Sequence, residues 1–247
     1  MTVVGKVVLV TGAASGIGRA LVVGFTKDGA RVAGFDCSES RLAETAKACD
    51  GKLLAVVGDI TSKADVDHLV STAMQHFGRI DVLFNNAGIA NPGVFLSRPF
   101  DDWVKVIQVN LIGVALCTYL VLPGMLERGY GRIINVASRA AEGANANMSA
   151  YSASKAGVIS FTKAVAREID RTRYPDVLIN VMIPGPTDTA IWSQVPASGA
   201  TSAPRQLQPP EAVYPHARFL VEFPAGGPHG RIFWDSQDYA VYQRFND

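Results

Sequence analysis

A tyrosine and a lysine at i, i+4 spacing, Tyr151 and Lys155, form the pair in this chain with the clearest capacity for proton chemistry. In a helix, that spacing places both side chains on one face. An ammonium beside a phenol favours the phenolate, so we expect Lys155 to lower the pKa of Tyr151. An unperturbed phenol titrates near pH ~10, so proton exchange at neutral pH needs a close and partly desolvated cation. Ser138 precedes the pair, and the meaning of all three depends on the elements that hold them.

Apolar, β-branched runs alternate with helical patterns along the chain. The predicted strands are Lys6–Thr11, Arg31–Asp36, Lys52–Val57, Asp81–Phe84, Gly131–Ala137, Val177–Met182 and Gly230–Trp234. The predicted helices are Ile17–Asp28, Glu39–Cys49, Ser62–Phe77, Phe100–Leu126 and Tyr151–Arg171. This alternation predicts an α/β fold, a doubly wound parallel sheet with helices on both faces. No domain boundary is visible, so residues 1–247 are expected to form a single dinucleotide-binding and catalytic domain.

A glycine-rich turn, Thr11-Gly-Ala-Ala-Ser-Gly-Ile-Gly18, joins the first predicted strand to the first predicted helix. Gly12 permits a tight turn, while Gly16 and Gly18 let a pyrophosphate approach the backbone at the helix N-terminus. The spacing differs from the G-x-G-x-x-G dinucleotide pattern, but the position between strand and helix fits it. We therefore expect the turn, including Ser15 and Ile17, to bind a nucleotide cofactor.

An acidic residue, Asp36, ends the second predicted strand. A carboxylate there accepts hydrogen bonds from the adenosine ribose and repels a 2′-phosphate. The places where a cation would receive that phosphate hold Ser15 and Cys37 instead. These residues predict NAD rather than NADP; the alternative is that Asp36 is only a strand-end turn residue.

Two further strand ends carry polar segments, Asp59-Ile60 and Asn85-Asn-Ala-Gly88. Ligands of open α/β sheets bind outside the carboxyl ends of the strands, where both segments are expected to lie. The second segment could also be a simple turn, because Asn and Gly serve turns well.

Taken together, these residues closely resemble the short-chain dehydrogenase/reductase family in its compact single-domain form. The resemblance extends over residues 5–190 and preserves the family's order and spacing. It rests on Thr11-Gly12-x3-Gly16-x-Gly18, Asn85-Asn86-Ala87-Gly88, Asn110, Ser138, Tyr151-x3-Lys155, and Pro184-Gly185 followed by Thr187 and Thr189. The resemblance implies a Rossmann-like fold, a nicotinamide cofactor and a catalytic tetrad.

The tetrad implied by this resemblance is Asn110, Ser138, Tyr151 and Lys155. Tyr151 would be the general acid/base at the substrate oxygen, and Ser138 would hold that oxygen by a hydrogen bond. Lys155 would lower the pKa of Tyr151 and bind the nicotinamide ribose. Asn110 would hold a water that links Lys155 to solvent.

The resemblance also implies contacts to the rest of the cofactor. Asp59 and Ile60 would meet the adenine edge. Residues beneath the adenosine ribose would be Asn86, Ala87 and Gly88. The turn that orients the nicotinamide carboxamide and touches the phosphates would comprise Pro184, Gly185, Thr187 and Thr189.

The substrate site is expected among residues near the tetrad and in a proline-rich stretch, Ser193–Pro210. We expect residues 191–210 to form a mobile lid over the site; the alternative is a plain surface loop. Polar candidates for substrate contact are Arg139, as a carboxylate ligand, and Glu142. Apolar candidates are Phe95, Met148, Ile191 and Trp192.

The function that follows is NAD(H)-dependent interconversion of a secondary alcohol and its ketone by hydride transfer. An NADPH-dependent carbonyl reductase is the alternative within the same class. A non-catalytic protein that senses the nicotinamide ratio is the alternative from another class. The four histidines are scattered, so no metal site is expected.

Composition and charge narrow the remaining possibilities. The net charge is +1 without a basic run, so no nucleic-acid partner is expected. The apolar stretch Leu111–Leu126 is judged too short to span a bilayer, and the start lacks a secretory pattern. Three cysteines without a Cys-x-x-Cys favour reduced thiols in a cytoplasmic protein. The family resemblance implies a homotetramer or dimer.

Overall fold

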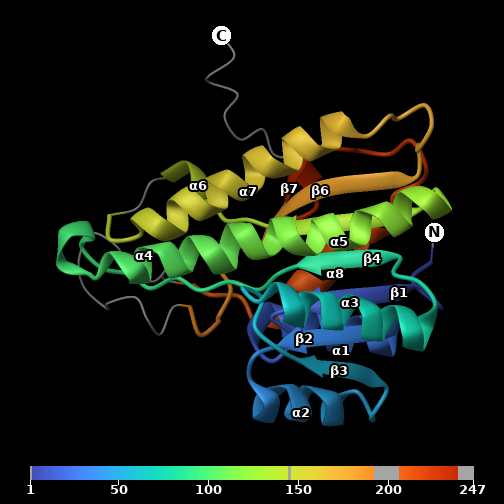
Figure 1. Cartoon of the computed structure of the whole chain (residues 1–247), viewed down its shortest axis with the longest axis horizontal. Coiled ribbons are helices and arrows are strands. Elements are labelled where there is room, and N and C mark those ends of the chain that lie inside the picture. Colours follow the sequence, from blue (N-terminus) through green and yellow to red (C-terminus); the bar gives the residue numbers. More distant parts are fainter. Residues whose placement is uncertain (1, 144–145, 192–205, 239–247) are drawn as a thin grey trace.

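The computed structural model describes residues 2–143, 146–191 and 206–238. Its eight strands form one sheet in the order β3-β2-β1-β4-β5-β6-β7-β8 (Figure 1). The strands are β1 Val7–Thr11, β2 Arg31–Asp36, β3 Leu53–Val57, β4 Val82–Asn85, β5 Gly131–Val136, β6 Val177–Ile183, β7 Ile232–Trp234 and β8 Gln237–Asp238. All neighbouring strands are parallel except β7 and β8, which are antiparallel. The predicted doubly wound parallel sheet is confirmed.

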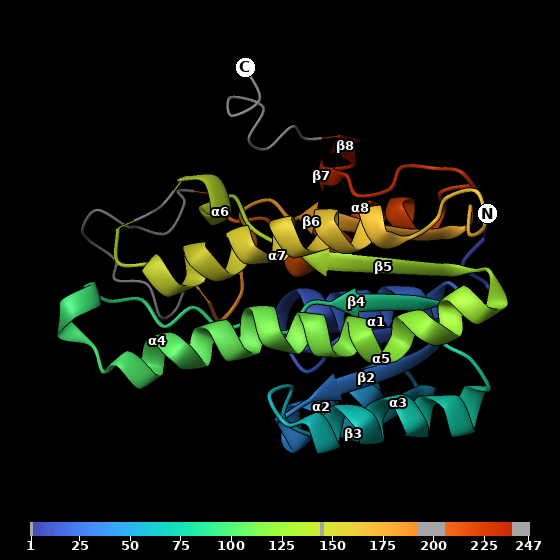
Figure 2. The same cartoon turned by 45° about the horizontal axis from the view of Figure 1, so that its top comes forward.

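Helices cover both faces of the sheet (Figures 1 and 2). They are α1 Gly16–Lys27, α2 Glu39–Ala48, α3 Lys63–Phe77, α4 Phe100–Ile107, α5 Gly113–Arg128, α6 Ala140–Gly143, α7 Ser149–Glu168 and α8 Tyr214–Val221. Successive side chains of a strand point to opposite faces. Val8 and Val10 of β1 accordingly join the core that contains α1, α2 and α8, whereas Leu9 joins the core under α3 and α5.

The helix that carries Asn110 is longer than expected and contains a π-helical turn. It runs from Phe100 to Arg128, a length of 29 residues, and passes through Pro123. The π-helical turn spans Gln108–Ile112 and separates α4 from α5. The apolar stretch Leu111–Leu126 belongs to this longer helix, so its own length does not decide whether the chain can cross a membrane. By length and composition alone the helix is long enough, as are many core helices of soluble proteins.

Several short elements were not expected from the sequence. They are α6, α8, the final strand β8, and 3-10 turns at Phe95–Ser97 and Pro210–Val213. Their brevity gives them too few residues for a helical or alternating pattern to stand out. Helix α8 nevertheless completes one face of the sheet, because its buried Ala217 and Leu220 belong to the core around α1.

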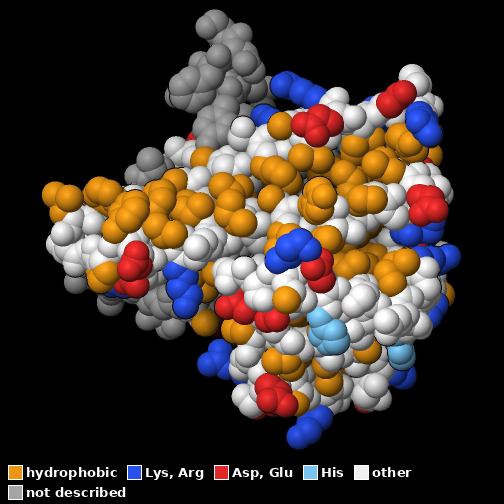
Figure 3. Space-filling view, in the orientation of Figure 1, with side chains coloured by type: hydrophobic (Ala, Val, Ile, Leu, Met, Phe, Trp, Pro, Cys, Tyr) orange, Lys and Arg blue, Asp and Glu red, His pale blue; other side chains and the backbone are white. Residues whose placement is uncertain are grey.

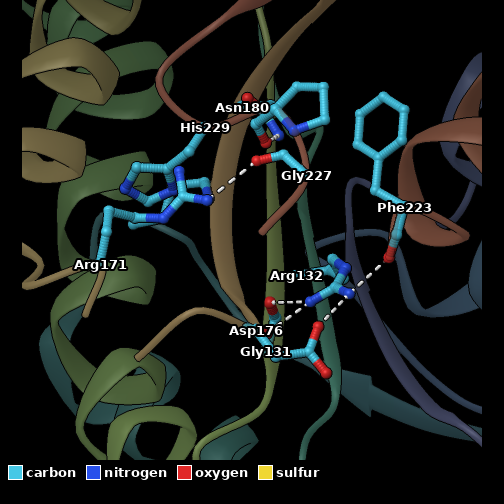
Figure 4. A network of polar contacts seen from close by, with 10 residues as sticks. Gly131, Arg132, Arg171, Asp176, Asn180, Phe223, Gly227 and His229 are labelled. Carbon is cyan, nitrogen blue, oxygen red and sulfur yellow. Dashed lines mark hydrogen bonds and ion pairs between the residues drawn. The ribbon is translucent and has the colours of Figure 1, made fainter. Parts of the chain in front are cut away.

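The amino ends of β5 and β6 are joined by a buried cationic side chain (Figure 4). The guanidinium of Arg132 donates to the carboxylate of Asp176 at 2.5 Å and to the carbonyl of Phe223 at 2.6 Å. Only 1% of the Arg132 side chain is exposed. Nearby, Arg171 donates to the carbonyl of Gly227 at 3.1 Å. This end of the sheet thus serves stability, which leaves the carboxyl ends of the strands for function.

Candidate active site

A cavity of about 430 Å³ lies at the carboxyl ends of the central strands. Of the residues predicted to bind the cofactor or catalyse, its lining includes Gly12, Ser15, Gly16, Ile17, Asp36, Asp59, Ile60, Asn86, Ala87, Gly88, Tyr151, Lys155, Pro184 and Thr189. The predicted residues outside this lining are Gly18, Asn110, Ser138, Gly185 and Thr187. The carboxyl ends of parallel strands meet at one edge, which is why residues so distant in sequence share one cavity.

The glycine-rich turn forms a close cradle beside this cavity. Gly12 has a positive φ of 69°, which glycine adopts without strain. A Cβ on Gly18 would lie 1.9 Å from the carbonyl oxygen of Gly12, so any larger residue would clash. Helix α1 begins at Gly16, which lines the cavity. Free N–H groups at a helix N-terminus bind anions, so the turn fits the pyrophosphate of a dinucleotide.

Asp36 lies at the same cavity and is held by backbone donors. Its Oδ2 accepts from the N–H of Ala14 at 3.1 Å, and its Oδ1 accepts from the N–H of Ser38 at 2.9 Å. A carboxylate has about four acceptor sites, so these bonds fix its orientation and leave sites for ribose hydroxyls. The first bond also ties the end of β2 to the glycine-rich turn.

The asparagine segment after β4 is fixed by the side chain of Thr11, the first residue of the glycine-rich motif, for which the sequence predicted no separate role. The hydroxyl of Thr11 accepts from the N–H groups of Asn86 and Ala87, both at 3.1 Å. The side chain of Asn86 donates in return to the carbonyl of Thr11 at 3.0 Å. Thr11 ends β1, so its position next to Gly12 is the signal that would have identified it.

The side chain of Asp59 is turned back on its own loop. Its Oδ1 accepts from both the N–H and the hydroxyl of Thr61 at 2.8 Å. Its neighbour Ile60 is buried, and a Cβ on Gly113 would lie 2.7 Å from the Ile60 side chain. Both residues line the cavity, and their contact with adenine stays a prediction.

Tyr151 and Lys155 lie one turn apart on α7, with the ammonium 5.7 Å from the centre of the tyrosine ring. Lys155 donates to the carbonyl of Val136 at 2.8 Å. Burial lowers the pKa of Lys155 to about 8. Burial also raises the pKa of Tyr151, and a hydrogen bond with Ser138 offsets only part of that rise. Desolvation of the phenolate thus exceeds the effect of the Ser138 hydrogen bond, and the expected lowering of the Tyr151 pKa by Lys155 stays a prediction.

Ser138 follows β5 and lies beside Tyr151. Its hydroxyl accepts from the N–H of Ala140 at 3.1 Å at the start of α6. Together with its hydrogen bond to Tyr151, this contact orients the hydroxyl. The two oxygens can therefore meet one substrate oxygen, although that role stays a prediction.

Asn110 lies in the π-helical turn, and its side chain is completely buried. Its amide accepts from the N–H of Ile89 and donates to the carbonyl of Ile89, both at 2.9 Å. The amide also donates to the hydroxyl of Ser154 at 3.0 Å. The amide is thus engaged by protein atoms, and the expected water on Asn110 stays a prediction.

The turn after β6 divides into cavity-lining and buried residues. Pro184 and Thr189 line the cavity. The hydroxyl of Thr187 instead donates to the carbonyl of Gly185 at 2.8 Å and accepts from the side chain of Gln208 at 3.3 Å. Thr187 and Gln208 also form a parallel backbone bridge. Thr187, which precedes the predicted lid 191–210, thus lies beside Gln208, which is near the end of that lid. Residues 192–205, including Trp192, lie outside the described residues.

The candidate substrate ligand Arg139 contacts Trp234 and does not line the cavity. Its guanidinium lies 4.5 Å from the centre of the Trp234 ring. Neither Arg139 nor Glu142 lines the cavity, whereas Ile191 does. The hypothesis that Arg139 binds a substrate carboxylate is therefore not favoured by its orientation.

Two exposed cations that were not expected from the sequence line the cavity. They are Arg41 on α2 and Lys105 on α4. Neither is adjacent in sequence to the glycine-rich turn or to Asp36. The two side chains reach the cavity because of how α2 and α4 are rotated about their axes. No sequence motif predicts that rotation.

Comparison with known proteins places this site in a family. The model of the short chain dehydrogenase family matches residues 6–199. The chain is 38% identical to the (2S)-[(R)-hydroxy(phenyl)methyl]succinyl-CoA dehydrogenase subunit BbsD of Thauera aromatica over 199 residues. This alignment covers 79% of each protein. It is 37% identical over 195 residues to the 2-dehydro-3-deoxy-L-rhamnonate dehydrogenase (NAD(+)) of a Sphingomonas species, which covers 78% of this chain and 77% of the relative.

A solved structure agrees over nearly the whole length. The 3-ketoacyl-(acyl-carrier-protein) reductase from Brucella melitensis, complexed with NADH, has a TM-score of 0.84 and 30% identity, and covers 94% of this chain and 97% of that chain. The protein is therefore a nicotinamide-binding oxidoreductase that acts on CH–OH groups of small molecules. With its family model, relatives and fold in agreement, the chain belongs to the short-chain dehydrogenase/reductase family.

Proposed function

We propose that this protein interconverts a secondary alcohol and its ketone with NAD(H) as the cofactor. The observation that carries this proposal is that Asp36, the glycine-rich turn, Tyr151 and Lys155 line one cavity. The anchored carboxylate of Asp36 supports NAD, because it offers acceptors to ribose hydroxyls and repels a 2′-phosphate. Among the relatives, one dehydrogenase is named for NAD(+), and one reductase structure holds NADH.

A nicotinamide bound in this cavity would accept or supply the hydride. Tyr151 holds the proton that the substrate oxygen gains or loses, and Ser138 supports that oxygen by a hydrogen bond. Lys155, which lines the same cavity, would hold the nicotinamide ribose. Because burial raises the pKa of Tyr151, the phenol form dominates at neutral pH and suits ketone reduction. Alcohol oxidation needs the phenolate, so its rate rises with pH.

A second candidate function is NADPH-dependent carbonyl reduction, and one observation favours it. Arg41 and Lys105 line the cavity that holds Asp36, and both are exposed cations. A guanidinium binds phosphate in a bidentate way, so Arg41 is the better ligand for a 2′-phosphate.

Initial rates with NAD and NADP on a panel of secondary alcohols test both candidates. We expect turnover with NAD and a preference over NADP of about tenfold or more, equivalent to about 1.4 kcal/mol. Asp36→Ala should narrow that preference, whereas Arg41→Gln should leave it in place. A preference for NADP that disappears in Arg41→Gln would establish the second candidate. No turnover with either cofactor on any alcohol or ketone would contradict both.

We also propose that the chain forms one catalytic domain whose residues 191–210 cover the substrate, and that it assembles as a homo-oligomer. The bridge between Thr187 and Gln208 supports the first part, because it fixes the base of this segment beside the cavity. Exposed apolar side chains on the π-helical turn and on α5 support the second part. Ile112 is 54% exposed and Tyr119 is 73% exposed. On the face seen in Figure 3, hydrophobic side chains gather along α4, α5 and α7.

A further inference from the structure

The segment Tyr151-Ser-Ala-Ser-Lys155 contains two serines whose environments differ. The hydroxyl of Ser154 donates to the carbonyl of Tyr151 at 2.7 Å and accepts from the amide of Asn110 at 3.0 Å. The hydroxyl of Ser152 is buried and has no hydrogen-bond partner among the described residues. Both serines lie on α7, so the difference comes from the side of the helix that each faces. Ser154, whose side chain is completely buried, faces the π-helical turn.

The contact with Ser154 completes the hydrogen bonding of the Asn110 amide. One N–H of that amide serves the carbonyl of Ile89, and the other serves Ser154. The amide oxygen accepts from the N–H of Ile89. Ile89 lines the cavity directly after the asparagine segment. The amide thus joins a cavity loop to α7, and Ser154 is its point of attachment on α7.

We propose that Ser154 is a positioning residue that fixes the Asn110 amide and, through it, the cavity loop at Ile89 relative to Tyr151 and Lys155. Ser154 touches neither the cavity nor the reacting groups, and acts through Asn110. It also satisfies the carbonyl of Tyr151, so one hydroxyl links three segments of the site: the loop after β4, the π-helical turn and the start of α7.

The surroundings of Gly88 explain why a movement of the Asn110 amide would matter for catalysis. A Cβ on Gly88 would lie 3.3 Å from the Asn110 amide oxygen and 3.5 Å from the Lys155 nitrogen. The amide and the ammonium therefore border the same small space. When Ser154 is lost, one buried N–H of Asn110 has no partner, and the amide gains freedom to rotate toward that space. The site would then keep its residues but lose their alignment, which affects the transition state more than binding.

The test compares Ser154→Ala with Ser152→Ala, its matched control from the same helix. Hydrogen exchange of the peptide that contains Ile89 is followed by mass spectrometry, because the Ile89 N–H donates to Asn110. In Ser154→Ala we expect exchange there to be about tenfold faster, with slow exchange retained in β5 and β6. Ser152→Ala should match wild type, since the Ser152 hydroxyl bonds to none of the residues that the structure describes.

The kinetic arm measures kcat and KM separately. In Ser154→Ala we expect kcat to fall about fivefold to tenfold while KM for NAD stays within about twofold. Ser154→Thr, which keeps a hydroxyl able to bond the preceding turn, should recover most of kcat. Unchanged kcat in Ser154→Ala, or equal loss in Ser152→Ala, would overturn the proposal.

Only the kinetic arm rests on the proposed function. If wild type turned over no alcohol or ketone, the function would fail, while the exchange of Ile89 would still decide the role of Ser154. Wild-type exchange at Ile89 in Ser154→Ala would overturn the positioning role even in a fully active enzyme.

Discussion

Two opposing effects set the proton affinity of Tyr151, and residue types alone do not show which is larger. The i, i+4 spacing of Tyr151 and Lys155 correctly predicts their shared face on α7. Burial of both groups then raises the pKa of Tyr151 and lowers that of Lys155 to about 8. Burial depends on the tertiary packing around α7, including Met148 and Ala140, which no motif encodes.

Removal of the Tyr151 hydroxyl tests its chemical role directly. We expect Tyr151→Phe to lower kcat by about 10²–10⁴-fold, because a positioned general acid/base contributes about that factor. Affinity for NADH, measured by fluorescence titration, should change little, since the ring remains and Lys155 is intact. Full turnover in this variant would contradict the mechanism.

At the scale of elements, strand positions follow from the sequence better than irregular turns do. The bounds Arg31–Asp36 of β2 match the prediction, because an apolar run ends at a charged residue. The π-helical turn at Gln108–Ile112 was not predicted, because it coincides with the contacts of Asn110 to Ile89 and Ser154, which are tertiary. The spacing of apolar residues predicts a helix whose geometry depends on its own sequence, whereas the π-helical turn coincides with tertiary contacts.

The buried cation that joins β5 and β6 should be a major source of stability. We expect Arg132→Met to lower the free energy of unfolding by about 3 kcal/mol, because the Asp176 carboxylate would lose its partner. Urea denaturation measures this change. Lys63→Met is the control, since its pair with Asp67 is exposed on α3 and should contribute at most about 0.5 kcal/mol. Similar losses in both variants would contradict the expectation.

The loop before β7 should make stability sensitive to acid through His229. Its Nδ1 accepts from the N–H of Ile179 at 3.1 Å, and its Nε2 bonds the carbonyl of Ala166 at 2.8 Å, which requires a neutral ring. Burial lowers the pKa of His229 below its ordinary 6.5. Below pH 6.5 the unfolded chain therefore binds more protons, and the stability from this group is lost as pH falls toward the folded pKa.

Urea midpoints between pH 7.5 and pH 5 measure this sensitivity. We expect the wild-type midpoint to fall over that range more steeply than the midpoint of His229→Gln. His68→Gln, at an exposed position on α3, should follow wild type. Parallel profiles for wild type and His229→Gln would show that another group is responsible.

At the scale of the whole molecule, the sequence predicts the composition of the site better than its orientation. Motif residues at strand ends gather at one cavity because the sheet topology requires it. The approach of Arg41 and Lys105, and the turn of Arg139 onto Trp234, depend on how helices and loops rotate. Cofactor choice, which we propose to depend on Asp36 and Arg41 together, can therefore be predicted only partly from the sequence.

The proposed oligomer gives a prediction at this scale. A glutamate in place of the 73%-exposed Tyr119 would bury a charge in any contact made by α5, so Tyr119→Glu should lower the molar mass measured by light scattering. Tyr119→Phe should keep the wild-type mass. A monomeric wild-type protein would contradict the assembly.

The bridge between Thr187 and Gln208 has a consequence for how this protein can change. These residues lie 21 positions apart in the chain, yet they pair side by side. Thr187 and Gln208 therefore form one anchored stem, and doubling the length of a flexible loop on such a stem costs only about 0.6 kcal/mol in loop closure. Insertions and deletions there can accumulate without moving Tyr151 or Asp36. Under the proposed function, the length of this segment can therefore change which substrates are accepted while the residues proposed for hydride transfer stay the same.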